Sequence, residues 1–139
     1  MGKNLNQSGS GGLAVIDDDS SAIGSVVCAL AWTAARGATN TVLVGSIPAN
    51  ARIIAINVQV PVVSNAATTA TVSVGLNGGS ATYFSAAQDV KTAVGNFSQA
   101  PTANWAISGA SQKVTCTYTE TGTASSAGTI YVALQYCVL

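Results

Sequence analysis

The sequence contains no histidine and very few charged residues. Its 139 residues include five basic and five acidic side chains, which is 7% of the chain, and the formal net charge is zero. Without an imidazole, a Ser-His-Asp triad, a Cys-His pair and a histidine base are all excluded. The three cysteines match no metal-binding spacing, and no histidine is present to complete a zinc site. The sequence therefore predicts a protein that is not an enzyme and that holds no cofactor or metal.

The scarcity of charge also limits the partners. The basic residues stand singly along the chain, at Lys3, Arg36, Arg52, Lys91 and Lys113. Phosphate backbones are bound by clustered Lys and Arg, so nucleic acid is not an expected partner. A typical soluble domain carries about 25% charged residues, and a neutral surface protects poorly against self-association. We expect much of the surface to be covered by other subunits, either in a homo-oligomer or in a larger lattice. A monomer kept in solution by Ser, Thr, Asn and Gln alone is the alternative.

No membrane segment is expected. The apolar-leaning run at 22–35, AIGSVVCALAWTAA, is short for a span and is interrupted by Ser25 and Thr33. It follows three aspartates, whereas a signal peptide begins with basic residues. We interpret the run as a buried strand of a protein made in a cytoplasm. Its thiols are then expected to be reduced.

The stretch from Ile47 to Val63 shows the organisation of the chain most clearly. A turn is predicted over 47–50, because proline pre-sets the first central position and Asn50 tolerates the backbone that follows. An alternating pattern then predicts a strand with one buried face, made of Ile54, Ile56, Val58 and Val60. Pro61 lacks an N–H donor, so the hydrogen-bonded ladder is expected to end there or to lie at a sheet edge.

Similar patterns predict further strands at 22–33, 41–45, 68–76, 111–120 and 130–138, the last of them central in its sheet. Residues 83–92 are predicted as a helical turn or an irregular crossover, and residues 94–110 as a loop with a short strand near Trp105 and Ile107. Strong helix signals are absent. We expect an all-β, single-domain β-sandwich or jelly roll over residues 22–139, preceded by an extended N-terminal arm at 1–21.

The arm combines a flexible run, NQSGSGG, with a short apolar patch that contains Leu13, Val15 and Ile16. These three side chains are predicted to anchor the arm on a partner surface. The three aspartates that follow lack the spaced oxygens and the glutamate of an EF-hand loop, so a solvated acidic turn is expected.

Few residues remain as candidates for chemistry. Asp89 and Glu120 are interpreted as surface charges at turns, although a paired-carboxylate glycosidase remains an alternative. Four aromatic residues are expected to fill the core or a subunit contact, with a sugar-stacking platform as the alternative: Trp32, Tyr83, Trp105 and Tyr131. Cys116 is in phase with core positions, whereas Cys137 is out of phase. The candidate interface residues are therefore Leu13, Val15, Ile16, Trp32, Trp105, Tyr131 and Cys137.

Residues 45–138 resemble a family of small tailed-bacteriophage virion proteins. The similarity lies in an IPANARI turn that enters a strand, a VSVG strand with a Gly-rich exit, an aromatic-Ala-Ala-Asp crossover, and TYTETGTASSAG before the last strand. Members of the family are jelly-roll or β-sandwich structural proteins, commonly capsid decoration, cement or head-fibre proteins, and they are often trimeric. The resemblance implies no active-site residues, and residues 1–40 lie outside it.

These observations together predict a non-enzymatic structural protein of a bacteriophage virion. We expect a capsid decoration or cement protein that binds the major capsid protein through its arm and packs against its own copies. The alternative is a tail or fibre knob that binds a host-surface glycan, with exposed aromatic residues at one end of the sandwich near Tyr83 or Trp105.

Overall fold

The described part of the chain is built almost entirely of β-strands. The computed structural model describes residues 23–31 and 39–138, with side chains from residue 41 onward. The strands are β1 (Ile23–Ala31), β2 (Thr39–Ile47), β3 (Ala51–Val62), β4 (Thr69–Leu76), β5 (Gln88–Asp89), β6 (Gly95–Ser98), β7 (Gln112–Thr121) and β8 (Thr129–Val138), and a short 3-10 helix, η2 (Ala103–Trp105), precedes β7.

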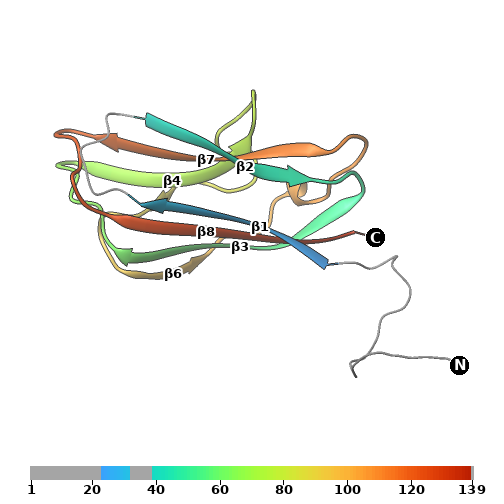
Figure 1. Ribbon diagram of the computed structural model, residues 1–139, viewed down its shortest axis with the longest axis horizontal. Helices are drawn as coiled ribbons and strands as arrows, with labels where there is room; N and C mark the ends of the chain where they lie inside the picture. The colour runs from blue at the N-terminus through green and yellow to red at the C-terminus, as the bar shows by residue number, and fades with distance from the viewer. Residues whose placement is uncertain (1–22, 32–38, 139) are drawn as a thin grey trace, which may run out of the picture.

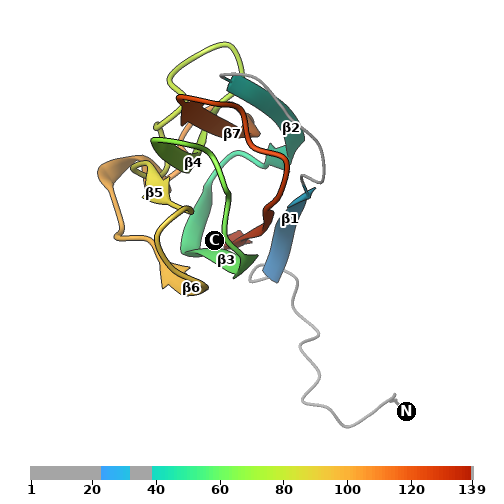
Figure 2. The ribbon, with the colours of Figure 1, turned by 90° about the vertical axis from the view of Figure 1, so that its left-hand side faces the viewer.

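These strands form two packed sheets, which Figures 1 and 2 show from the side and from one end. One sheet has the order β1-β8-β3-β6 and the other the order β2-β7-β4-β5. The antiparallel pairs β1–β8, β2–β7, β3–β6 and β4–β5 join strands from opposite halves of the chain. The described chain therefore runs like one long hairpin, folded between β4 and β5 and wound into two layers. The predicted all-β sandwich is confirmed.

The core lies between the layers and is formed by the inner faces of both sheets. In β8, Ile130, Val132 and Leu134 are buried, as its alternating sequence predicts. This strand pairs with β1 on one side and β3 on the other, so its predicted central position is also confirmed. Further buried apolar side chains come from the opposite sheet and its connections: Ala70, Val72, Val74, Phe84, Val90, Val114, Cys116 and Tyr118.

Strand β3 departs from the predicted pattern at one position. Ile53 is buried, whereas Ile54 is 49% exposed, although Ile54 was expected in the core. The pairing with β8 shifts between Ile53 and Ala55, which leaves Ile54 as an extra residue without a partner. Such a β-bulge changes which residues of the strand face inward. Beyond it, Ile56, Val58 and Val60 are buried as predicted.

The region before β7 contains a strand that the sequence pattern does not predict. Residues Gly95–Ser98 form β6 and pair with β3 from Asn57 to Val60. On the β6 side the pairing stops immediately before Pro61, as the missing N–H of proline predicts. On the β8 side β3 continues past Pro61 and pairs again, Val62 with Thr129. Tyr83–Thr92 is an irregular crossover that contains only the two-residue β5, and its helical alternative is wrong.

The backbone conformation of Asn50, in the turn before β3, can be tested by substitution. Asn50 has φ 64°, the left-handed region that costs about 1 kcal/mol for a residue with a Cβ and little for glycine. We expect Asn50→Ala to lower the free energy of unfolding by about 1 kcal/mol, since alanine cannot form the local hydrogen bonds of asparagine, and Asn50→Gly to change it little. Urea denaturation of both variants measures the difference. An alanine variant as stable as the parent protein would contradict the argument.

Candidate functional site

A buried carboxylate organises one end of the sandwich. Glu120, near the end of β7, is 3% exposed, so its interpretation as a surface charge is wrong. Its Oε2 accepts a hydrogen bond from the Tyr118 hydroxyl, and its Oε1 accepts one from the backbone N–H of Ser125 at 2.9 Å. The Tyr118 oxygen also lies 2.7 Å from Ser64 Oγ and 3.1 Å from Ser125 Oγ. Both carboxylate oxygens are thus engaged, as a buried charge requires.

The hydrogen bonds decide the charge state of this cluster. Burial by itself would raise the pKa of the Glu120 carboxyl, but the bonds from Ser125 and Tyr118 together outweigh burial and hold the pKa below its ordinary value. Burial raises the pKa of Tyr118, and its bond to Glu120 raises that pKa further. Glu120 is therefore an anion and Tyr118 a neutral donor at neutral pH.

Further hydrogen bonds next to this cluster join two connections, the β3–β4 segment at 63–68 and the β7–β8 segment at 122–128. Asn65 Oδ1 accepts hydrogen bonds from the backbone N–H groups of Ser126 and Ala127, at 2.9 and 3.0 Å. Its Nδ2 donates to Ser126 Oγ at 3.1 Å. The arrangement joins distant segments and presents no carboxylate to a substrate, so we assign it a structural role.

The outer side of the β2-β7-β4 layer carries rows of hydroxyl side chains, of which Ser73, Thr115 and Thr117 are buried and Thr41 is exposed. Register places Thr41, Thr117 and Ser73 in one row across the strands, and Leu43 beside Thr115 in the next. Thr41 Oγ1 and Thr117 Oγ1 lie 3.1 Å apart, so these hydroxyls bond to each other. Leu43, on β2, is 56% exposed. These two rows carry no charged residue.

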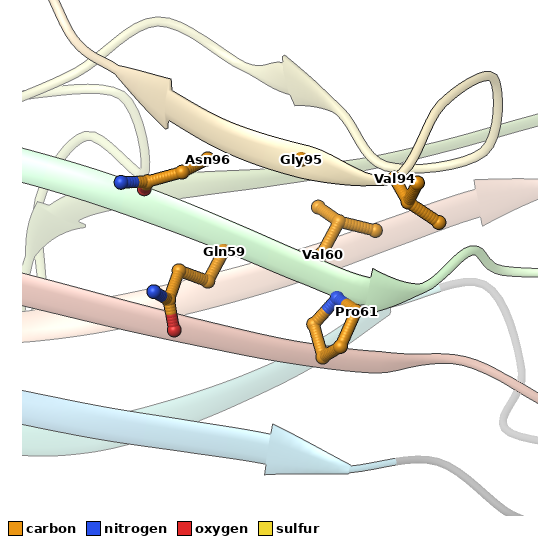
Figure 3. Close-up of a pocket in the computed structure, with 6 residues that line it drawn as sticks. All are labelled: Gln59, Val60, Pro61, Val94, Gly95 and Asn96. Atoms are coloured by element: carbon orange, nitrogen blue, oxygen red, sulfur yellow. The ribbon is translucent and has the colours of Figure 1, made fainter.

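The outer face of the other sheet is hollowed between β8, β3 and β6. Two adjoining hollows of about 500 and 320 Å³ share Gln59 and Asn96 among their lining residues. Figure 3 shows the larger one, lined by Gln59, Val60 and Pro61 of β3 and by Val94, Gly95 and Asn96 of the neighbouring segment, with the side chains of Gln59 and Pro61 extending away from β6. The smaller one adds Asn57, Tyr131, Val132 and Ala133. We call the two hollows together the amide groove.

The predicted interface residues fall in different environments. Leu13, Val15, Ile16 and Trp32 lie outside the described residues, and their contacts stay a prediction. Tyr131 is 40% exposed on the amide groove, and Cys137 is half-buried on β8.

Trp105 does not belong among the interface candidates. It is buried, and its indole N–H donates to the Phe84 carbonyl oxygen at 2.7 Å. Of the two interpretations left open for it, core filling is the one the structure supports. Its sugar-stacking alternative fails for the same reason, because a buried ring offers no face to a ligand.

Among residues 41–138, the structure shows no group of three acidic or cysteine side chains placed to hold a metal ion. The described residues also include no helix long and apolar enough to cross a membrane. The amide groove was not predicted. Its polar residues are outward-facing positions of β3, β6 and β8, and the pairing of β3 with β6 and with β8 brings them together.

Comparison with solved structures finds the same fold in three bacteriophage capsids. A chain of the cyanophage Pam1 capsid asymmetric unit superposes with a TM-score of 0.70 at 18% identity, covering 94% of both chains. A chain of the acid-stable capsid of Helicobacter pylori bacteriophage KHP30 gives 0.63 at 11% identity, covering 84% of this chain and 87% of the other. A chain of the Ralstonia phage GP4 capsid gives 0.61 at 16% identity, covering 89% and 88%. No protein-family model and no curated protein sequence matches the chain.

The carboxylate cluster generates a prediction about acid stability. Because the pKa of Glu120 is lowered in the folded state, its contribution to stability is present above the ordinary value of 4.5 and is lost as the pH falls through the folded-state pKa. We expect Glu120→Gln to lower the free energy of unfolding at neutral pH by about 2 kcal/mol. The free energy of unfolding of the variant should also fall less than that of the parent protein between neutral and acid pH. Chemical denaturation at a series of pH values measures both effects.

Asp89→Asn is the comparison at an exposed carboxylate. Asp89 Oδ1 accepts a hydrogen bond from the backbone N–H of Lys91 at 2.9 Å, and the hydrogen bonds from Thr92 and Lys91 lower its pKa. We therefore expect an effect in the same direction but smaller, because water screens an exposed group. Equal effects of the two substitutions would show that the buried cluster has no special role in stability.

Proposed function

We propose that this chain is a non-enzymatic structural protein of a bacteriophage virion, located on the shell as a decoration or cement protein. The observation that carries the proposal is the similarity in fold to chains of three phage capsid structures, over at least 84% of each chain. Agreement over nearly the whole length means that the chain has the size of those capsid chains as well as their topology.

The winding of the strands supports the same assignment. The first strand pairs with the eighth, the second with the seventh, the third with the sixth and the fourth with the fifth. This order results when one long antiparallel hairpin is rolled into two layers. We infer that the sandwich is a jelly roll, an architecture common in viral capsid proteins.

The surface chemistry also fits a protein that stays in an assembly. The described chain exposes several apolar side chains on strands and connections: Leu43, Ile54, Val62 and Val94. Among the described residues, the outer faces of the two sheets carry few charged side chains, among them Arg52 on β3 and Lys113 on β7. In the proposed function, copies of the chain and the capsid protein cover the exposed side chains of Leu43, Ile54 and Val62, with a homotrimer as the expected unit.

Attachment is assigned to the N-terminal arm, residues 1–21. Its apolar residues Leu13, Val15 and Ile16 would lie on the capsid protein, for example as a strand added to a sheet edge. A protein that binds only the closed shell stabilises that shell by mass action, by about 2.7 kcal/mol per site at a free concentration 100 times the dissociation constant.

The glycan-binding knob is less well supported as the principal function. It predicted exposed aromatic residues near the loops that hold Tyr83 and Trp105. Trp105 is buried, and Tyr83 is half-buried with its ring 4.9 Å from that of Phe84 in an edge-to-face contact. Neither ring offers an open platform at that end of the sandwich.

The oligomeric state can be tested directly. We expect the purified full-length protein to have the mass of a trimer or larger species by light scattering across a dilution series, because a nearly uncharged surface favours association. A monomer at every concentration would contradict the proposed packing of copies and would leave attachment to the shell as the only assembly contact.

The role of the arm can be tested with shells assembled without the protein. We expect deletion of residues 1–21 to abolish co-sedimentation with the shells and to return their thermal disruption temperature to that of bare shells. A triple variant, Leu13→Ser, Val15→Ser and Ile16→Ser, should behave in the same way, whereas Lys3→Ala should bind normally. Undiminished binding of the deleted form would disprove anchoring by the arm.

A further inference from the structure

The amide groove places three unlike polar side chains side by side on neighbouring strands. Gln59 of β3 is in register with Tyr131 of β8 on one side and with Asn96 of β6 on the other. In the next row, Asn57 is in register with Ala133 and Ser98. Figure 3 shows Gln59 and Pro61 on β3, with Asn96 and Val94 at opposite ends of the neighbouring segment.

These groups retain hydrogen-bonding capacity. Ser98 Oγ donates to Asn57 Oδ1 at 2.8 Å, which orients that amide and leaves its NH₂ group to donate elsewhere. Within residues 41–138, the structure shows no hydrogen bond made by the side chains of Gln59, Asn96 or Tyr131. Each of the three can act as both donor and acceptor, and Tyr131 adds a ring that is 40% exposed.

We propose that the amide groove binds a neutral oligosaccharide. A sugar presents hydroxyl groups that are both donors and acceptors, and C–H faces that are apolar. Amides match the hydroxyls, while the ring of Tyr131 and the side chains of Pro61 and Val94 match the apolar faces. The hollows, of about 500 and 320 Å³, have the size of small-ligand sites. Their lining residues include no charged side chain, which favours a neutral ligand over an acidic one.

Other occupants fit the groove less well. A peptide strand binds through main-chain hydrogen bonds. It would add to the open edge of β6 and extend the sheet sideways, and would not cover Gln59 or Tyr131, which lie on the interior strands β3 and β8. A second copy of the chain would place an apolar centre at its interface, whereas Gln59 and Asn96 occupy the middle of this surface. Nucleic acid would require basic residues along the groove.

This inference concerns the isolated chain and does not depend on attachment to a shell. On a virion, such a site would allow weak, repeated contacts with the neutral polysaccharides of a cell surface. Many copies would add to the strength of adhesion.

The experiment uses the full-length protein on an array of neutral oligosaccharides, which includes gluco-, xylo- and N-acetylglucosamine hexamers, and of sialylated and sulfated glycans. The neutral glycan with the strongest signal is then titrated by calorimetry. We expect binding with a dissociation constant of about 1 mM or tighter, and no preference for the acidic glycans. Absence of binding to every neutral glycan, or a preference for acidic ones, would overturn the proposal.

Substitutions locate the site. Tyr131→Ala and Gln59→Ala should each weaken binding by about tenfold, because each removes a group that meets the sugar directly. Asn77→Ala is the matched control, since Asn77 is exposed in the turn after β4 on the other sheet, and its affinity should equal that of the parent protein. Far-UV circular dichroism and the native mass are recorded for each variant. Unchanged binding in both groove variants, or a change in oligomeric mass on Tyr131→Ala, would overturn the proposal, the latter by identifying the groove as a contact between copies.

Discussion

The buried carboxylate of Glu120 sets a constraint that much of this fold must satisfy. A charge removed from water is tolerated only when hydrogen-bond donors converge on it. Here the donors come from Tyr118 on the same strand and from Ser125 in the following connection, while Ser64 reaches the Tyr118 oxygen from the β3–β4 connection. Satisfying one anion therefore holds two inter-sheet connections in place and fixes how the two layers meet at that end.

The outer faces of the sandwich differ from this buried cluster in their polar groups. They carry almost no charge, and their polar groups are amides and hydroxyls, several of which bond within the sheet, as Thr41 does with Thr117 and Ser98 with Asn57. Such faces are compatible with close protein contacts and with neutral ligands, since neither requires the removal of ionic hydration. Of the five charged side chains among residues 41–138, only Glu120 is buried, and it is there because hydrogen-bond donors surround it.

Local patterns were sufficient to predict most strands and the turn at Asn50, because alternation and left-handed turn residues are recorded in consecutive positions. Four features depended on partners distant in sequence and were missed. Strand β6 has no apolar alternation and is a strand only because β3 pairs with it. Ile54 is displaced by a bulge that appears only against β8. The burial of Glu120 and the amide groove both result from tertiary pairing, which periodicity does not report.

The pairing of β1 with β8 has a consequence for synthesis. Strand β8 follows all the other described strands in the chain and lies between β1 and β3, which have no direct pairing with each other in the sheet order. While the ribosome is still making β7, the β1-β8-β3-β6 sheet lacks its strand β8. The edges of β1 and β3 that β8 will pair with are then open to proteases and to aggregation. A chain interrupted before β8 leaves that layer unformed, so the topology itself favours removal of incomplete products before they can enter an assembly.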